Sequence, residues 1–313
     1  MDIEEVKQTL RGPMIPVITN LQEDLSIDHG AIRENVGYVV ERGIQWGRGV
    51  LLAGGAGGDF PMLSLDERNQ VALTVVEAAA GTPVLVGVQD THLDICIEMA
   101  RFAEEIGAYG IQVSPSYYYA ATDDDCLRWF EAIHDATRSV ALVAYNTYWE
   151  GYCMSLDVVT RLACLPRCVS LKWSHPEIGT YQRGVIRMAS RLAVVDNQGV
   201  AGLTHMLGGT GFITHLCTLW PEHDLEVWDL LEAGDYLAAQ RKMCEANWPW
   251  LDFRGKMWKR TGAESPVVKA GLELCGRPGG PSRQPTRSLT EDERLELRDV
   301  FRWIGVPNLT PEK

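Results

Sequence analysis

The sequence predicts an α/β protein, a (β/α)8 TIM barrel with a C-terminal helical extension. Eight short apolar runs alternate with amphipathic stretches over about the first 220 residues, and the chain beyond them shows a helical pattern alone. The length of 313 residues and the hydrophobic content of 46% are ample for one large core. On the pattern alone, a doubly wound parallel sheet is the alternative.

The apolar runs predict the strands in order. They cover residues 14–19, 49–54, 83–88, 110–115, 140–146, 168–174, 192–196 and 211–214. Between the first six strands, helices are expected at about 28–42, from 64 onward, and at about 92–107, 122–138 and 155–165. Ser64 and Glu67 have capping-box spacing, and Thr122 precedes three aspartates that suit a helix N-terminus.

Beyond residue 220 the pattern predicts further helices at 221–232, 235 to about 259, 267–274 and 290–303. A turn-rich segment at 276–281 separates the last two. We therefore expect residues 1–220 to form the barrel that carries the active site. Residues 221–313 are expected to pack on the barrel as helices.

Composition excludes several classes of function. A net charge of −13 argues against binding to nucleic acid or to an anionic membrane surface. No run approaches the length of a membrane-spanning helix, and the acidic N-terminus is unlike a signal peptide. Eight scattered cysteines form no CxxC pair, which is typical of a reduced, cytoplasmic protein.

The segment 168–174 places a lysine, Lys172, near the end of an apolar strand between two prolines. Burial disfavours an ammonium ion, and a neutral amine is a nucleophile that can form a Schiff base with a carbonyl compound. The alternative is that Lys172 reaches solvent or pairs with a carboxylate.

Other strands also end in polar or glycine-rich segments. These are residues 54–59 after the second strand, 114–119 after the fourth, 145–146 on the fifth and 196–198 on the seventh. Each alone could be a turn or a packing feature. In a barrel, the carboxyl ends of the strands meet at one face, so together with Lys172 they indicate an active site.

From about Gly12 to Val306 the chain resembles the dihydrodipicolinate synthase and N-acetylneuraminate lyase superfamily of class I, Schiff-base-forming aldolases. The resemblance rests on the glycine-rich loop, a Tyr-Asn pair, the strand lysine, a Leu-Gly-Gly-x-Gly segment and a late helix and turn. These are residues 55–59, 145–146, 172, 207–211 and 269–281.

The resemblance implies roles for individual residues. Lys172 would form an imine with the keto carbon of a 2-oxo acid, and Tyr145 would shuttle protons. Backbone N–H groups of the glycine-rich loop would hold the substrate carboxylate, and a carbonyl at the end of the eighth strand would face the site. The implied substrate-binding residues are Ala56, Gly57, Gly58, Asp59, Tyr117, Glu150, Asn197 and Ile213.

Several positions depart from the family pattern. Ala56 and Gly57 stand where the family carries hydroxyl residues, and losing one hydrogen bond to a charged group costs about 1.5–3 kcal/mol unless another group replaces it. Asp59 replaces a glutamate. Glu150 replaces an arginine that binds a carboxylate in the synthases, so true dihydrodipicolinate synthesis is disfavoured.

Tyr117 falls where the synthases supply a tyrosine across a subunit interface, but its relay partner would be Ala56. Around the far end of the substrate we expect a pocket suited to a polyhydroxylated or aromatic tail. Its expected lining residues are Trp149, Trp173, His175, Asn197 and Gln198.

The leading hypothesis is a Schiff-base lyase, an aldolase or dehydratase, that acts on a 2-oxo acid such as a keto-deoxy sugar acid. A pyruvate-dependent condensing synthase and a non-catalytic metabolite-binding barrel are the alternatives. We expect no cofactor and no metal, because the histidines show no ligand spacing at a strand end. The resemblance implies a homotetramer, or at least a dimer, with no nucleic-acid or membrane partner.

Overall fold

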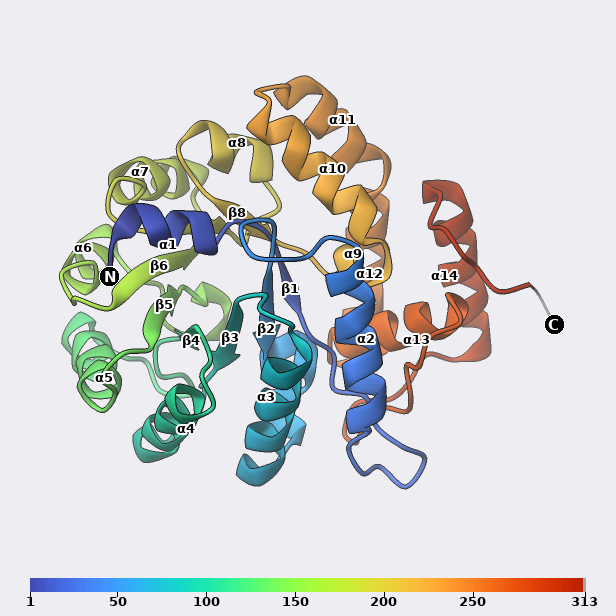
Figure 1. Cartoon of the computed structure of the whole chain (residues 1–313), viewed down its shortest axis with the longest axis horizontal. Helices are drawn as coiled ribbons and strands as arrows, with labels where there is room; N and C mark the ends of the chain where they lie inside the picture. Colours follow the sequence, from blue (N-terminus) through green and yellow to red (C-terminus); the bar gives the residue numbers. More distant parts are fainter. Residues whose placement is uncertain (312–313) are drawn as a thin grey trace. The chain divides into compact units, whose positions relative to one another are not determined.

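The computed structural model describes residues 1–311, and the last two residues of the expected helical region lie outside this range. Within the described residues, eight parallel strands close into a barrel in the order β1 to β8 (Figure 1). The strands are β1 (Gly12–Pro16), β2 (Val50–Ala53), β3 (Val84–Gly87), β4 (Gly110–Val113), β5 (Ala141–Tyr145), β6 (Cys168–Trp173), β7 (Ala193–Asp196) and β8 (Gly211–Ile213). The predicted barrel is confirmed, and its closure excludes the doubly wound sheet.

Helices and short 3-10 turns connect and follow the strands. Up to β8 they are α1 (Ile3–Thr9), α2 (His29–Glu41), η1 (Ala56–Gly58), η2 (Phe60–Met62), α3 (Leu65–Ala78), α4 (Leu93–Glu105), α5 (Asp123–Asp135), η3 (Tyr148–Glu150), α6 (Leu156–Leu162), α7 (Ile178–Met188) and α8 (Ala201–Met206). After β8 they are α9 (Leu216–Leu219), α10 (Pro221–Glu232), α11 (Tyr236–Glu245), α12 (Asn247–Thr261), α13 (Ser265–Leu274) and α14 (Glu291–Ile304). Both predicted helix starts form capping boxes. Ser64 pairs with Glu67 at the start of α3, and Thr122 pairs with Asp125 at the start of α5.

The barrel closes where β1 pairs with β8. Gly12 is the register partner of Gly211, and a Cβ atom on Gly211 would lie 2.5 Å from the carbonyl oxygen of Gly12. Only glycine allows the two backbones to approach this closely. The glycine at the start of β8 is therefore needed for closure.

Apolar side chains from six strands, all except β4 and β8, fill the barrel interior and reach its amino-terminal end, and the half-buried Ile213 of β8 packs against them. The cluster includes Met14, Val50, Leu85, Val143, Val169 and Val195. The sequence analysis did not anticipate α1, a short helix capped by Asp2, which adds Val6 and Leu10 to the same cluster. Because α1 immediately precedes β1 and contacts β6 and β7, it covers this end of the barrel, opposite the expected site.

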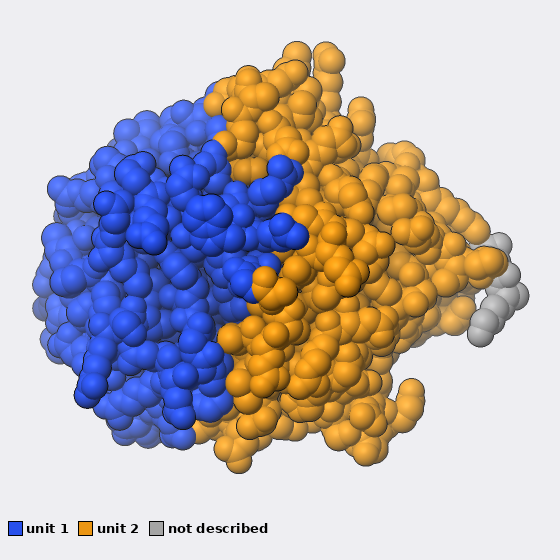
Figure 2. All heavy atoms as spheres, viewed as in Figure 1, with its two compact units in different colours: residues 1–14, 45–52, 81–213 blue, residues 15–44, 53–80, 214–313 orange. Residues whose placement is uncertain are grey.

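By its contacts the chain forms two compact units, coloured separately in Figure 2. Unit 1 (residues 1–14, 45–52 and 81–213) holds the strands except for the last residues of β1 and β2. Unit 2 (residues 15–44, 53–80 and 214–313) holds the segments after β1 and β2 together with α9 to α14. The boundary expected at residue 220 was placed by counting strand–helix repeats, not from contacts. It stays a prediction.

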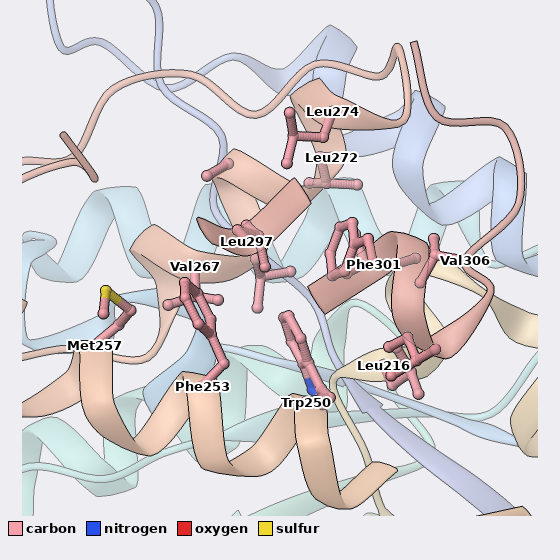
Figure 3. Packing of buried hydrophobic residues seen from close by; sticks show 14 of the residues in the cluster. Leu216, Trp250, Phe253, Met257, Val267, Leu272, Leu274, Leu297, Phe301 and Val306 are labelled. Atoms are coloured by element: carbon pink, nitrogen blue, oxygen red, sulfur yellow. The ribbon is translucent and has the colours of Figure 1, made fainter. Parts of the chain in front are cut away.

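Unit 2 has its own apolar core. Trp250 and Phe253 of α12 point toward Leu297 and Phe301 of α14, with Val267 of α13 beside them (Figure 3). The Trp250 and Phe301 rings lie 5.7 Å apart. The long helix predicted from residue 235 is in fact two helices that break at Ala246. Pro249 explains the break, because proline lacks the N–H that would bond the carbonyl one turn earlier.

Candidate active site

Tyr145 and Lys172 lie side by side at the carboxyl ends of β5 and β6. Their Cα atoms are register partners, so both side chains leave the same face of the sheet. The Lys172 Nζ lies 4.0 Å from the centre of the Tyr145 ring, and the lysine is 4% exposed. The aromatic face can stabilise an ammonium ion, while burial favours the neutral amine. The alternative that Lys172 reaches solvent is not seen.

Asn146 ties the ends of these two strands together. Its buried side chain donates to the Ser174 carbonyl (2.7 Å) and accepts from the Met154 N–H (2.9 Å). The Ser174 hydroxyl donates back to the Asn146 carbonyl (2.9 Å), and the Asn146 N–H donates to the Lys172 carbonyl (3.1 Å). The backbone beside Tyr145 and Lys172 is thereby held in place. Sequence analysis quoted Asn146 in a motif but gave it no role, because its partners are distant in sequence.

Trp173 does not line the barrel interior, so the expectation that it lines a substrate pocket is wrong. Its indole is fully buried and donates to the Tyr181 carbonyl on α7 (3.1 Å). A Cβ atom on Gly184, also on α7, would lie 2.6 Å from the indole nitrogen, so this glycine makes room for the ring. Successive strand residues face opposite sides, and Lys172 takes the inner one.

Trp149 lies close to the tyrosine instead. It belongs to η3, directly after β5, and its ring centre is 6.1 Å from that of Tyr145. Its neighbour Glu150 is exposed at the end of the same turn. Both residues follow the strand that carries Tyr145, and their predicted contacts with the substrate stay predictions.

Asp196 shapes the turn after β7. Its buried carboxylate accepts from the Tyr181 hydroxyl (2.6 Å) and from the Gln198 N–H (3.0 Å). Burial raises the pKa of Asp196, against the opposing effect of these hydrogen bonds. The Gln198 side chain accepts from the His175 N–H (2.7 Å), while the half-buried Asn197 donates its N–H to the Trp173 carbonyl (2.9 Å). The turns after β6 and β7 are thus joined.

The remaining predicted residues of unit 1 lie in the loop after β4 and at the end of β8. Tyr117 is half-buried, and the next two residues, Tyr118 and Tyr119, are exposed. Tyr118 has a φ of 83°, a conformation that a bulky residue rarely adopts. Ile213 is the last residue of β8 and is half-buried.

The glycine-rich loop belongs to unit 2 and forms the 3-10 turn η1. The Gly58 N–H donates to the Gly55 carbonyl (2.9 Å), and the Thr19 hydroxyl donates to the Gly58 carbonyl (2.7 Å). The Gly58 N–H is therefore used within the turn, in contrast to its expected role in holding a carboxylate. The N–H groups of Ala56 and Gly57 begin the turn, where a helix makes no bond of its own to them.

Asp59 anchors this loop to α13. The Ser265 hydroxyl donates to its carboxylate (2.5 Å), and the Lys269 ammonium lies 3.1 Å away. Lys269 also donates to the Pro281 carbonyl (3.1 Å), and both charged groups are buried. The Asp59 carboxylate is thus engaged by groups within unit 2.

His215, two residues after β8, also lies against this loop in unit 2. The imidazole is 6% exposed, and its Nε2 is 3.1 Å from a carboxylate oxygen of Glu264. A Cβ atom on Gly57 would overlap the His215 Cε1. Sequence analysis did not select His215. The available signal was the glycine at position 57, where the family carries a side chain.

A closed (β/α)8 barrel with a buried lysine in register with a tyrosine at the carboxyl ends of its strands is an arrangement that can support Schiff-base chemistry. Residues 9–303 match the family described as the dihydrodipicolinate synthetase family. The chain belongs to this family and is a Schiff-base-forming lyase of the class I aldolase type.

Known proteins resemble the chain in sequence and in fold. A probable 5-dehydro-4-deoxyglucarate dehydratase of Saccharopolyspora erythraea is 28% identical over 95% of each chain. Dihydrodipicolinate synthase of Acinetobacter baumannii, solved in complex with pyruvate, superposes with a TM-score of 0.84 at 23% identity, over 95% of this chain and 100% of that one. A monomeric dihydrodipicolinate synthase variant gives a TM-score of 0.85 at 22% identity, over 96% and 98%.

Proposed function

We propose that the protein dehydrates a keto-deoxy sugar acid through an imine on Lys172. The observation that carries this proposal is the buried Lys172 in register with Tyr145. Family membership supports the imine. Relatives that are described as probable 5-dehydro-4-deoxyglucarate dehydratases support both the substrate class and the loss of water.

The proposed reaction begins at the lysine. The Lys172 nitrogen attacks the keto carbon, and the former carbonyl oxygen leaves as water, so that a protonated imine forms. This imine accepts electrons. Loss of a proton from the neighbouring CH2 carbon gives an enamine, which then expels the hydroxyl group on the next carbon as a second water. Hydrolysis consumes one water and frees the lysine, so one water is lost overall.

Tyr145 would transfer the protons in these steps. It lies beside the amine, and a positioned proton-transfer group contributes about 10²–10⁴-fold to a rate. Trp149 packs beside the tyrosine ring, at the start of the pocket proposed for the substrate's far end.

The other predicted residues take binding or positioning roles in this proposal. The N–H groups of Ala56 and Gly57 would bind the carboxylate next to the keto carbon, while Gly58 and Asp59 hold the shape of the loop. Asn197 and the carbonyl of Ile213 would contact the substrate. Glu150 would accept from hydroxyl groups and disfavour a second carboxylate at the far end.

The experiment is borohydride trapping followed by intact-mass spectrometry and peptide mapping. The probes are pyruvate, 5-dehydro-4-deoxyglucarate and its monocarboxylate analogue 2-dehydro-3-deoxygluconate. We expect a reduced adduct on Lys172, loss of one water from the sugar acids, and preference for the monocarboxylate. Lys172→Ala, checked for native circular dichroism, should form no adduct and show no turnover.

Three results would redirect the proposal. Normal turnover by Lys172→Ala would exclude the imine mechanism. A carbon–carbon bond formed from pyruvate and an aldehyde, without dehydration of the sugar acids, would favour the condensing synthase. Thermal stabilisation by these ligands without any adduct would favour the metabolite-binding barrel.

We also propose that the protein is a cytoplasmic homo-oligomer, a dimer or a homotetramer, in which Tyr117 reaches a neighbouring subunit. The exposed rings of Tyr118 and Tyr119 beside it support an aromatic contact surface. Within residues 1–311, every helix is too short or too polar to cross a bilayer. Light scattering after gel filtration should give a dimer or tetramer, whereas a monomer, as in one similar solved structure, would remove Tyr117 from the site.

A further inference from the structure

An open pocket lies between α12 and α14 of unit 2, beside the end of α11. Its volume is about 400 Å³, which is within the range of sites that bind small organic ligands. Trp248 and Asp252 line it from α12, and Val300 and Trp303 line it from α14. These helices all belong to unit 2, and the proposed reaction uses none of these residues.

The core of unit 2 fixes the floor of this pocket. Phe253, which also lines it, is 4% exposed and points toward Leu297 and Phe301 (Figure 3). Val300 packs against the same core. Because this core holds the helices on both sides of the pocket together, the shape of the pocket does not depend on a ligand.

Two tryptophans expose a large apolar surface at the pocket. Trp248 is 49% exposed and Trp303 is 75% exposed, although soluble proteins bury most of the surface of their tryptophans. The face of an indole attracts cations more strongly than the rings of the other aromatic side chains do. Exposed indoles at a preformed pocket therefore favour a ligand that covers them and that carries a positive charge.

The charged side chains at the pocket also favour a cation. Asp252, Lys256 and Glu296 line it. Lys256 and Glu296 form an ion pair with each other, whereas within residues 1–311 the exposed Asp252 has no ion-pair partner. Asp252 therefore leaves a net negative charge at the pocket, in a chain whose net charge is −13. Such a pocket attracts cations and repels anions.

We propose that this pocket binds a quaternary ammonium compound, with the cationic head against Trp248 and Trp303 and beside Asp252. A trimethylammonium head combines a positive charge with apolar methyl groups, so it gains both from contact with the indoles and from burial. A primary ammonium carries the same charge but is more strongly hydrated. The inference is independent of the proposed function, because no residue of the pocket takes part in the proposed reaction.

The test compares choline with 3,3-dimethylbutan-1-ol, a neutral molecule of nearly the same shape in which carbon replaces the charged nitrogen. Saturation-transfer NMR on the methyl signal of each molecule measures its binding to the full chain. We expect saturable binding of choline and binding of the neutral alcohol that is weaker by about 10-fold or more. Ethanolamine, the primary ammonium counterpart, should displace choline only at about 10-fold higher concentration.

Two variants with matched controls locate the binding. Trp303→Ala should weaken choline binding by about 5-fold or more and leave the thermal midpoint nearly unchanged, because the side chain is 75% exposed. Its control is Trp258→Ala, since Trp258 is 50% exposed on α12 and is not among the residues that line the pocket. Asp252→Asn should weaken choline binding by about 3-fold and leave binding of the neutral alcohol unchanged. Its control is Asp299→Asn, an exposed acid of α14 outside the pocket.

Four results would overturn the inference. Equal binding of choline and the neutral alcohol would mean that the pocket selects only apolar shape. Absence of saturable choline binding, or equal losses in Trp303→Ala and Trp258→Ala, would show that choline does not bind at these indoles. A lower mass of Trp303→Ala in light scattering would mean that a second copy of the chain covers this face. If Trp303→Ala fails to fold, Asp252→Asn and Asp299→Asn decide by the same comparison.

Discussion

At the scale of single residues, the alternation of the β6 strand sets which side chain faces the barrel interior. Lys172 faces the barrel interior beside Tyr145, while the next residue, Trp173, faces α7 and packs on Gly184. A shift of one residue in register would exchange these two side chains, replacing the amine by an indole. The register therefore matters as much for the chemistry as the presence of a lysine.

Tyr145→Phe is expected to slow turnover by about 10²-fold or more, because it removes a positioned proton-transfer group while keeping the ring beside Lys172. The measurement is kcat with the substrate found by trapping. Tyr152→Phe is the matched control, since the Tyr152 hydroxyl donates to Asp123 (2.7 Å) and has no proposed part in the reaction. An unchanged rate for Tyr145→Phe would remove this hydroxyl from the mechanism.

At the scale of elements, single polar side chains hold the barrel's connections. Asn146 joins the segments after β5 and β6, and Asp59 joins the glycine-rich loop to α13. Glu104, near the end of α4, holds the turn that leads into β5. Its carboxylate accepts from the N–H groups of Arg138, Ser139 and Val140 and from the Ser139 hydroxyl.

The Glu104 contacts predict a pH-dependent stability. Burial opposes ionisation of Glu104, but the hydrogen bonds from Ser139, Arg138 and Val140 outweigh burial and lower its pKa from 4.5 to about 2. Since the pKa of the folded state is the lower one, the stabilisation is present above about pH 4.5 and is lost as the pH falls toward 2. Glu104→Gln should cost about 1–2 kcal/mol at pH 6, allowing for partial exposure, and progressively less below pH 4.5.

Urea unfolding at pH 6 and at pH 3 would measure this difference. Glu105→Gln, an exposed neighbour, should follow the wild type at both values. A Glu104→Gln cost that is the same at pH 6 and pH 3 would contradict the assigned role.

At the scale of the whole molecule, each compact unit contains a hydrophobic core of its own. The barrel interior of unit 1 is filled by small and branched side chains, whereas the core of unit 2 is built from large rings and aliphatic residues on α12, α13 and α14. The C-terminal helices thus form a packed body of their own with the segments after β1 and β2.

Phe301→Ala is expected to destabilise the protein by about 3–5 kcal/mol, because it leaves a cavity beside Trp250 in a fully buried core. Trp303→Ala on the same helix is the control. Trp303 is 75% exposed, so its loss should change the free energy of unfolding by no more than about 0.5 kcal/mol. Denaturant unfolding followed by circular dichroism would measure both, and equal effects would contradict the assignment of this core.

Much of the fold could be predicted from the sequence because its signals are local. Each of the eight apolar runs overlaps an observed strand, and the capping residues Ser64 and Thr122 begin helices as predicted. The break at Ala246 was missed although Pro249 signals it. The short helix α1 was missed because seven residues are too few to form a stable helix alone. Burial of its apolar side chains against the barrel stabilises it.

By itself, the sequence determined the barrel, the family and the lysine–tyrosine pair, through local patterning and motif spacing. Only the tertiary structure decided that Trp173 faces a helix, that the Gly58 N–H is used within its turn, and that His215 lies against Gly57. Hydrophobic periodicity and helix capping depend only on residues that are close to one another in the sequence. The surroundings of a site are set by contacts such as Asp59 with Lys269, which exist only after distant segments have packed together.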